Sequence, residues 1–415
     1  MSVIWLLKPA ELTLKGDNRK AFETVLKRNL QTMLAGYKVR LEMRSGRFYL
    51  HADEQDQPLV EDVLRRLIGI AGWAQTCGLP KTIEAVIAAC VDEGKKIAAQ
   101  GFGSFKIEAR RTDKSFPCNS FDLRCRGGEA VLAAVPALRV DVHRPAAVIR
   151  IEIREKAYVY SDARKGLGGL PVGTAGRGLL LLSGGIDSPV AGFLMAARGM
   201  GIDAVHFHAY PYTSEEAKQK TIRLAEILGG YCMGMRLHIV GFAKVQMRIK
   251  EQAPQPWATV LLRMAMMDCA EKVGRKIKAK CLITGESLSQ VASQTIENLS
   301  CTQSVVALTV LRPLIGMDKE TIIKKAQQIG TFKTSIEPHQ DCCVLFTPPH
   351  PVLRGNPAEA MGLYKSLELG PLIEEALREY ETVKCGYSLN SGILPERKSS
   401  SLQSPSPTVM PNASG

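Results

Sequence analysis

A short run of small and acidic residues, Ser183-Gly184-Gly185-Ile186-Asp187-Ser188, has the composition of a loop that binds anions. It follows residues 178–182, whose continuous apolar character is typical of a parallel strand buried on both faces. It precedes residues 190–198, which we predict to form a helix with Pro189 in its first turn and Gly199 just beyond its end. Glycines in such a turn let backbone N–H groups approach a phosphate, and the helix dipole favours the negative charge. The sequence therefore predicts a phosphate site between a strand and a helix.

The order of residues in this loop separates it from other phosphate-binding motifs. The chain contains neither G-x-x-x-x-G-K-[ST] nor G-x-G-x-x-G, which excludes the Walker A and dinucleotide motifs. Ser-Gly-Gly-x-Asp-Ser resembles instead the PP-loop of the N-type ATP pyrophosphatases. Those enzymes cleave ATP between its α and β phosphates and leave AMP on a substrate oxygen. A glycine turn without a ligand is the alternative interpretation.

The residues downstream of the loop predict the elements that must hold it in place. Strands are expected at 204–208, 237–240 and 281–284, and helices at 217–228 and 260–273. This alternation is typical of a doubly wound parallel sheet, which binds ligands at the carboxyl ends of its strands. The carboxyl end of the strand expected at 204–208 carries His206 and His208, which would lie on the same face of the strand. A metal ion bound by these two histidines is an alternative, but the sequence offers no third ligand at a suitable spacing.

The first 165 residues predict two smaller α+β units. In the first, strands at 3–7 and 37–50, the latter broken at 44–47, flank an amphipathic helix at 18–34. In the second, we expect a helix at 86–99 and strands at 104–110 and 149–161. Residues 163–173 are rich in glycine and predict a linker.

The charge of the chain is unevenly distributed. The sequence holds 54 Lys and Arg against 41 Asp and Glu, and residues 1–171 hold 28 and 20 of these, an excess of eight out of thirteen. A polyanion bound by this N-terminal part is one interpretation, and a solvated basic surface is the other. Phe105, Phe116 and Phe121 would then stack bases or pack in the core, and we favour the core.

Composition excludes several classes of protein. A chain of 415 residues with 45% hydrophobic and 23% charged residues is typical of a soluble globular protein of two or three domains. We expect a cytoplasmic location, because no apolar run is long enough to span a membrane and the start lacks a secretion signal. The eleven cysteines predict reduced thiols. We expect Cys77, Cys90, Cys232 and Cys281 to be small buried apolar residues.

Five motifs, taken in their order along the chain, resemble one family. They are Glu11-Leu12-Thr13-Leu14-Lys15-Gly16-Asp17-Asn18-Arg19, the 183–188 loop, Thr284-Gly285-Glu286-Ser287 with 290–295, Arg312-Pro313-Leu314-Ile315-Gly316-Met317-Asp318-Lys319, and Asp341-Cys342-Cys343. Together they are similar to the tRNA 4-thiouridine synthetases, also called tRNA sulfurtransferases. The resemblance covers roughly residues 1–385.

The resemblance implies an α/β fold in three parts. We expect an N-terminal ferredoxin-like α+β domain at 1–60, a THUMP RNA-binding domain at 61–165 and a linker at 166–177. A PP-loop ATP pyrophosphatase domain with a doubly wound parallel sheet would occupy 178–385, and a disordered tail 386–415. Longer family members carry a rhodanese domain after the PP-loop domain, and we expect this chain to be a form that lacks that domain. The expected absence of the rhodanese domain makes a role in thiamine biosynthesis less well supported.

The resemblance also implies a reaction. Such an enzyme uses ATP and Mg²⁺ to adenylate the uridine at position eight of tRNA and replaces its O4 with sulfur to give 4-thiouridine. It would act as a homodimer that holds tRNA through its basic N-terminal half. Contacts to the nucleotide are expected at Leu181, Leu182, Ser183, Gly184, Gly185, Asp187, Ser188, His206, Phe207, Arg263, Gly285 and Gln294. Core packing is the alternative for Leu181, Leu182 and Phe207.

Three residues are expected to carry the catalysis. Asp187 would organise Mg²⁺ and pyrophosphate, and Lys319 would supply positive charge near the phosphates; a solvated charge at a helix end is the alternative for Lys319. Cys342 matches the cysteine of the family's catalytic domain and would receive sulfur from a PLP-dependent cysteine desulfurase. We assign no metal ligands in the protein, although zinc binding by His339, Cys342, Cys343 and His350 is conceivable.

Two other functions are compatible with parts of the sequence. One is a different PP-loop ligase that forms amides, as NAD synthetase and GMP synthetase do. The other is a noncatalytic RNA-binding protein that uses the basic N-terminal half. The ligase would neither require Cys342 nor respond to tRNA, and RNA binding alone would be unaffected by Asp187→Ala.

Overall fold

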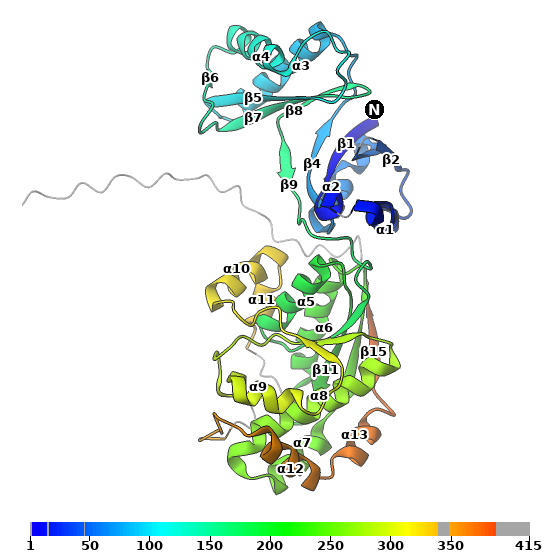
Figure 1. The fold of residues 1–415 in the computed structure, drawn as a ribbon, viewed down its shortest axis with the longest axis vertical. Helices are drawn as coiled ribbons and strands as arrows, with labels where there is room; N and C mark the ends of the chain where they lie inside the picture. Colours follow the sequence, from blue (N-terminus) through cyan, green and yellow to red (C-terminus); the bar gives the residue numbers. More distant parts are fainter. Residues whose placement is uncertain (1, 15, 45, 339–347, 387–415) are drawn as a thin grey trace, which may run out of the picture.

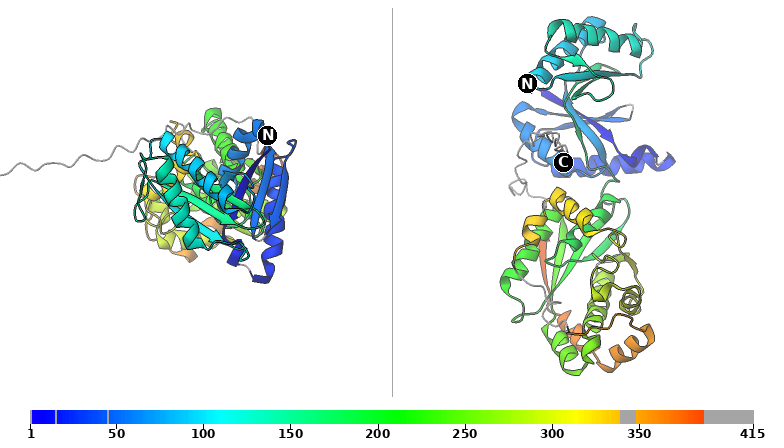
Figure 2. Two further views of the ribbon diagram at one scale, coloured as in Figure 1. Left: turned by 90° about the horizontal axis from the view of Figure 1, so that it is seen from above. Right: turned by 90° about the vertical axis from the view of Figure 1, so that its left-hand side faces the viewer.

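The computed structural model describes residues 2–14, 16–44, 46–338 and 348–386, and within them three β-sheets follow one another along the long axis of the molecule (Figure 1). Figure 2 shows the same succession from the side, with the largest unit at one end. The expected tail at 386–415 lies almost wholly outside the described residues. Within the described part, no helix has both the length and the apolar character needed to cross a membrane.

The first unit is built on a five-stranded sheet. Its order is β2 (Arg40–Arg44), β3 (Arg47–Asp53), β1 (Ser2–Pro9), β4 (Ile70–Thr76) and β9 (Ala163–Lys165). Strand β1 pairs antiparallel with both β3 and β4, and helices α1 (Arg19–Met33) and α2 (Gln57–Arg66) belong to the same unit. The helices and one sheet face enclose a core around Trp5, Leu26, Leu50 and Leu64, which are fully buried.

The predicted strand break at 44–47 is confirmed, because β2 and β3 form a hairpin in which Gly46 has φ of 75°. The expected domain boundary after residue 60 falls inside α2. Since β4 pairs with β1 and β9 pairs with β4, we propose a boundary after β4, with the chain returning to the first unit at β9.

The second unit contains a four-stranded sheet covered by two helices. The sheet order is β6 (Arg139–Val140), β5 (Ser104–Arg111), β7 (Ala147–Ile153) and β8 (Ala157–Tyr160), and the helices are α3 (Ile83–Ala99) and α4 (Ser120–Ala134). The prediction of one strand over 149–161 was wrong. Strands β7 and β8 pair antiparallel with Ile153 opposite Ala157, so the chain reverses between them. Both strands are mostly buried, and β7 itself contains Arg150 and Glu152, so the charged residues 154–156 between the strands do not stand out as a turn.

The predicted linker is docked rather than extended. Leu170 N donates to Ala197 O at 3.0 Å, and Gly173 N donates to Gly199 O at 2.8 Å. Gly169 has φ of 74°, and a Cβ there would lie 2.1 Å from Ala197 O, so only glycine permits the approach. The linker therefore packs on the end of α5, the helix that begins at the 183–188 loop.

The third unit is a doubly wound six-stranded sheet, as predicted. Its order is β14 (Thr309–Leu311), β13 (Cys281–Ile283), β10 (Arg177–Leu181), β11 (Gly201–His208), β12 (Met235–Gly241) and β15 (Glu381–Cys385). All neighbouring strands are parallel except β12 and β15. Its described helices are α5 (Asp187–Ala197), α6 (Glu215–Gly229), α7 (Ala243–Gln252), α8 (Ala258–Lys276), α9 (Ile296–Gln303), α10 (Lys319–Ile329), α11 (Phe332–Ser335), α12 (Pro357–Ser366) and α13 (Gly370–Ala376).

The two faces of this sheet bury separate cores. Leu179 packs with α7, α8 and α9 on one face, and Leu180 packs with α5, α6 and α10 on the other. Both side chains are fully buried, which explains the continuous apolar run at 178–182. The carboxyl ends of β10, β11 and β13 consequently meet at one edge.

The burial of individual cysteines and phenylalanines agrees with the sequence predictions at most positions. Cys90, Cys232 and Cys281 are buried as expected, but Cys77 is exposed, because it lies just beyond the end of β4. Phe105 and Phe116 are core residues. Phe121 is not, since 63% of it is exposed and the Arg124 guanidinium lies 5.5 Å from the centre of its ring.

Candidate active site and nucleic-acid interface

The 183–188 loop is held in shape by its own serines. Ser183 N donates to Ser188 Oγ at 2.9 Å, the two hydroxyl oxygens are 3.0 Å apart, and Gly185 N donates to Ser183 Oγ at 3.3 Å. Helix α5 starts at Asp187, so its N-terminal N–H groups and positive dipole end face this turn. The loop is therefore ordered for an anion without help from a ligand.

A neighbouring loop packs directly on this turn. Gly285, two residues after β13, lies so close that a Cβ would be 2.7 Å from Ser188 N and 2.8 Å from Ser188 Cα. A side chain at this position would displace the turn. The absence of a side chain at Gly285 therefore sets the spacing between two strand ends of the sheet.

A cavity of about 260 Å³ opens beside the loop, and we call it the loop pocket. It brings together ten of the twelve residues that the sequence proposed for the nucleotide, with only Gly184 and Gly185 outside its lining. The lining residues are Leu181, Leu182, Ser183, Asp187, Ser188, Val205, His206, Phe207, Arg263, Met266, Met267, Thr284, Gly285, Glu286 and Gln294. The sequence reasoning missed Met266 and Met267, whose spacing on α8 is typical of ordinary core residues.

The apolar wall of the loop pocket is part of the hydrophobic core. Phe207 is 6% exposed and packs on Phe242 with ring centres 4.6 Å apart, while Leu182 is 3% exposed. Both residues also line the pocket. Core packing and ligand contact are therefore compatible here, and the wall offers apolar side chains suited to an aromatic base.

The two histidines of β11 are each engaged in the fold. His206 Nδ1 is 3.1 Å from Leu182 O, and His208 Nδ1 is 3.1 Å from Thr213 Oγ1. Burial lowers the pKa of His208, which favours the neutral form of its ring. Among the described residues, no three His, Cys, Asp or Glu side chains are grouped as a metal site.

Asp187 joins three segments at the mouth of the loop. Its Oδ1 accepts a hydrogen bond from Lys319 Nζ at 2.7 Å, and its Oδ2 accepts one from Gln290 Nε2 at 2.9 Å. Lys319 is the first residue of α10, where the helix dipole disfavours a cation. Helix stability therefore does not explain this lysine, and its charge is available at the loop. Gln290 lies in a motif that the sequence singled out, but its contact with Asp187 was not foreseen.

A buried carboxylate with two arginine partners forms another wall of the loop pocket. Glu286 pairs with Arg263 of α8 and with Arg312, which follows β14. Burial raises the pKa of Glu286, but the guanidinium groups of Arg263 and Arg312 and the Thr284 hydroxyl outweigh burial and hold the pKa below 4.5. The sequence identified Arg263 but gave Glu286 and Arg312 no role.

Cys342, the expected sulfur-accepting residue, lies outside the described residues, as do His339 and Cys343. The chain that leads toward it is anchored beside the loop. Ser335 Oγ donates to Gly185 O at 3.2 Å, and the buried Lys220 donates to Glu337 O at 2.9 Å.

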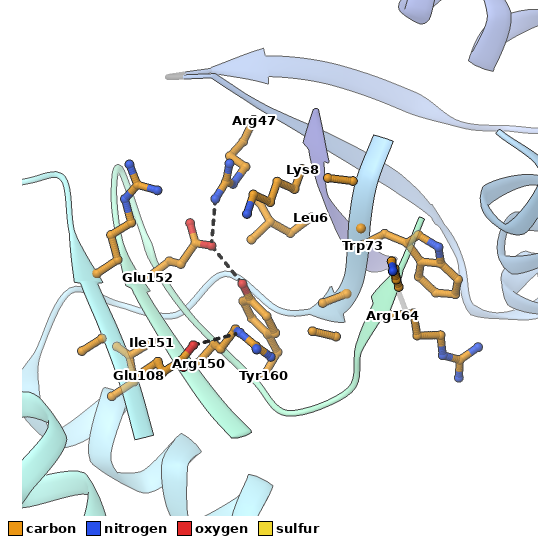
Figure 3. Close-up of a pocket in the computed structure, with 17 residues that line it drawn as sticks. Leu6, Lys8, Arg47, Trp73, Glu108, Arg150, Ile151, Glu152, Tyr160 and Arg164 are labelled. Atoms are coloured by element: carbon orange, nitrogen blue, oxygen red, sulfur yellow. Dashed lines mark hydrogen bonds and ion pairs between the residues drawn. The ribbon is translucent and has the colours of Figure 1, made fainter. Parts of the chain in front are cut away.

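A second, basic cleft lies between the first two units (Figure 3). It has a volume of about 600 Å³ and adjoins another cavity of about 490 Å³. We call the two together the basic cleft. The cationic side chains that line it are Lys8, Arg19, Arg47, Arg110, Arg150, Arg154, Arg164 and Lys165.

Glu152 organises the arginines of the basic cleft. Its carboxylate accepts a hydrogen bond from Arg154 Nε at 2.7 Å. It also accepts one from Tyr160 Oη at 2.9 Å, and Arg47 of the first unit pairs with it at 3.4 Å (Figure 3). The Arg164 guanidinium lies 4.9 Å from the centre of the Trp73 ring. Cations far outnumber carboxylates along the cleft, so its chemistry suits a chain of phosphates.

Three family models match consecutive parts of the chain. The ThiI ferredoxin-like domain matches residues 4–74, the THUMP domain matches 80–162, and the family described as Thiamine biosynthesis protein (ThiI) matches 173–369. These ranges follow the three sheets in order.

Known proteins resemble the chain over nearly its whole length. A probable tRNA sulfurtransferase of Treponema pallidum (strain Nichols) is 49% identical over 380 residues, which cover 91% of this chain and 94% of that protein. Another, from Caldanaerobacter subterraneus subsp. tengcongensis, is 44% identical and covers 85% and 92%. A crystal structure of a 4-thiouridine synthetase–RNA complex with bound ATP is similar with a TM-score of 0.83 at 35% identity, covering 92% of this chain and all of that one.

Proposed function

Since this chain belongs to the tRNA sulfurtransferase family, we propose that it is an ATP-dependent enzyme that converts uridine 8 of tRNA to 4-thiouridine. The observation that carries the proposal is the meeting of the 183–188 loop, the Asp187–Lys319 pair and an apolar wall in one pocket. Such a pocket accommodates both the phosphates and the base of ATP. The ATP-bound 4-thiouridine synthetase of the same fold supports this assignment.

The chemistry requires activation of the uracil carbonyl. Oxygen at C4 is a poor leaving group, so O4 attacks the α phosphorus of ATP and pyrophosphate departs. A sulfur nucleophile then attacks C4, and AMP leaves with the original oxygen. The loop N–H groups and Lys319 stabilise the negative charge that develops on the phosphates. Asp187 orients Lys319 through their 2.7 Å hydrogen bond.

The residues at the loop also fit Mg²⁺. Protein-bound Mg²⁺ commonly uses one or two carboxylates and takes its other ligands from substrate phosphates and water. Asp187 supplies one carboxylate at the mouth of the loop, and the phosphates would supply further oxygen ligands. The Lys319 side chain beside Asp187 is 43% exposed, so this end of the loop is open to solvent. Bound there, Mg²⁺ would neutralise phosphate charge.

The basic cleft is the surface that we propose for tRNA. Its cations come from both N-terminal units, so binding there would engage the two sheets together. The RNA in the similar 4-thiouridine synthetase complex supports RNA as the ligand class. We further propose a cytoplasmic homodimer in which the cleft of one subunit serves the loop pocket of the other.

For the sulfur step we propose Cys342 as the acceptor of a persulfide from a PLP-dependent cysteine desulfurase. The terminal sulfur of this persulfide is a good nucleophile at neutral pH and attacks C4 as AMP leaves. A second thiol, supplied as an added dithiol, then cleaves the S–S bond to Cys342, so that the sulfur remains on the base. The anchoring of Ser335 on Gly185 supports this proposal, because it brings the preceding segment beside the phosphate loop.

The test uses purified protein, unmodified tRNA transcript, a desulfurase with cysteine, a dithiol reductant, Mg²⁺ and ATP. We expect near-ultraviolet absorbance of 4-thiouridine to appear with one AMP formed for each thiolated base, and a tRNA with cytidine at position 8 to remain unmodified. A reaction that proceeds equally well without ATP would overturn the proposed activation. Loss of thiolation in Cys342→Ser, with pyrophosphate release retained, is the result expected for the sulfur step.

A further inference from the structure

Glu286 lies at the centre of a buried charge cluster on the wall of the loop pocket. Only 4% of its side chain is exposed. Its Oε1 pairs with Arg263 Nη2, and its Oε2 accepts hydrogen bonds from Arg312 Nε at 2.7 Å and from Thr284 Oγ1 at 2.8 Å. Both carboxylate oxygens are therefore occupied by protein donors, and the carboxylate faces cations.

The sheet brings this cluster together. Strands β13 and β14 run parallel with Ile283 opposite Leu311, and Thr284 N donates to Leu311 O at 3.1 Å. Glu286 and Arg312 thus follow adjacent strand ends. Arg312 is held from its other side, because its Nη1 donates to Gln303 Oε1 of α9 at 2.7 Å. Arg263 reaches the same carboxylate from α8, on one face of the sheet.

The cluster presents an arginine to the loop pocket. Two guanidinium groups flank one carboxylate, and Arg263 lines the pocket beside Glu286, whereas Arg312 lies outside the lining. A carboxylate in direct contact with a polyphosphate would repel it. The arrangement instead uses the carboxylate to fix an arginine whose charge is favourable to ATP.

We propose that Glu286 and Arg312 are positioning residues that hold the Arg263 guanidinium in the wall of the loop pocket, in the orientation that binds ATP. The inference rests on the proposed function, because it places ATP in this pocket. Arg312 fixes Glu286, and Glu286 fixes Arg263. The affinity for ATP therefore depends on two side chains that act through a third.

The test is a double-mutant cycle on the dissociation constant of ATP. Wild-type protein is titrated first, and failure of the wild type to bind ATP would refute the proposed function rather than this inference. We expect Glu286→Gln and Arg263→Gln each to raise the dissociation constant by about tenfold or more. The double variant should bind ATP no more weakly than Arg263→Gln alone, because Glu286 acts only through that arginine. Additive losses, or wild-type affinity in Glu286→Gln, would overturn the inference.

Two further variants separate positioning from general stability. Glu271, also on α8, is 10% exposed at its side chain, pairs with Arg275 and accepts a hydrogen bond from Ala307 N at 2.7 Å. Glu271→Gln should lower the melting temperature and leave the affinity for ATP unchanged. Glu286→Asp keeps the charge but shortens the side chain, and we expect an affinity between those of the wild type and Glu286→Gln. If Glu286→Gln does not fold, wild-type affinity in Glu286→Asp counts against the inference. In the steady state, Glu286→Asp should raise the KM for ATP without changing the KM for tRNA.

Discussion

Lys319 and Asp187 are 132 positions apart in the chain, yet Lys319 Nζ donates to Asp187 Oδ1 at 2.7 Å. Each residue is the first of a helix, α10 and α5 respectively. An aspartate at that position is favourable to its helix dipole, whereas a lysine is not. Asp187 therefore stabilises the start of α5, whereas Lys319 destabilises the start of α10. The two side chains meet where the phosphates would bind.

Replacing Lys319 should impair the adenylation step. We expect Lys319→Gln to lower kcat for AMP formation by about 100-fold or more, because a preorganised positive charge is removed from the place where negative charge develops. Binding of tRNA should be unchanged. The control is Lys324→Gln on the same helix, whose side chain is 76% exposed and pairs only loosely with Glu320 at 3.8 Å. A near-wild-type kcat in Lys319→Gln would show that Lys319 is only a solvated surface charge without a role in adenylation.

A methyl group at Gly285 should disable the phosphate loop. Its Cβ would lie 2.7 Å from Ser188 N, so the backbone of the loop must move. Since a displacement of about 1 Å at a reacting centre can cost about 100-fold in rate, we expect a loss of that order in AMP formation for Gly285→Ala. Gly316→Ala is the matched control, because a Cβ there meets no atom within 4 Å. Equal activity of the two variants contradicts the prediction.

The basic cleft should govern the salt dependence of tRNA binding. Lys8 and Arg110 line both of its cavities, so we expect Lys8→Ala with Arg110→Ala to weaken binding of all tRNAs. The slope of log affinity against log salt should become shallower by about 1 for each phosphate that the variant no longer neutralises. Lys95→Ala is the control, because Lys95 lies on α3 outside the cleft lining and is 63% exposed. An unchanged slope would place the RNA elsewhere on the protein.

Glu152 should make the stability of the N-terminal units depend on pH. Burial raises its pKa, but Arg47, Arg154 and the Tyr160 hydroxyl outweigh burial and hold the pKa below 4.5. A carboxyl whose pKa is lower in the folded protein adds stability above about pH 4.5, and this stability is lost as pH falls through the folded pKa.

We expect Glu152→Gln to cost about 3 kcal/mol at pH 7, because it removes the carboxylate charge that pairs with the buried Arg154. The difference in Tm between wild type and variant should shrink below pH 4.5. Calorimetry of the unfolding transition of the N-terminal units, at pH values from 7 down to 3, measures this difference in Tm. A difference that stays constant over this range would show that the carboxylate charge is not responsible.

The general architecture could be predicted from the sequence because its signals are local. The apolar run at 178–182, the glycine loop and the helix after it appear as β10, the turn and α5. The family resemblance is confirmed, and so is the three-part α/β fold. Strand burial and helix periodicity depend on residues a few positions apart, so a single sequence displays them.

Errors arose where a feature depended on contacts between distant residues. One strand was expected over 149–161, but the partner of β7 is β8 itself after a reversal. The boundary expected after residue 60 stays a prediction, and we propose one after β4 because β4 and β9 pair with the first sheet from separate parts of the chain. Pairing partners of strands are not encoded in local composition.

The sequence by itself determined that a phosphate loop sits between a strand and a helix in a sulfurtransferase of tRNA. The sequence also placed the charge of Lys319 near the phosphates, but only the tertiary structure decided the contacts: Lys319 and Gln290 on Asp187, and Arg312 behind Glu286 and Arg263. The physical reason is that ion pairs and hydrogen bonds act through space at about 3 Å, whereas position along the chain does not report distance. The parallel sheet brings residues that are distant in the chain close together in space, because the carboxyl ends of its strands meet at a single edge.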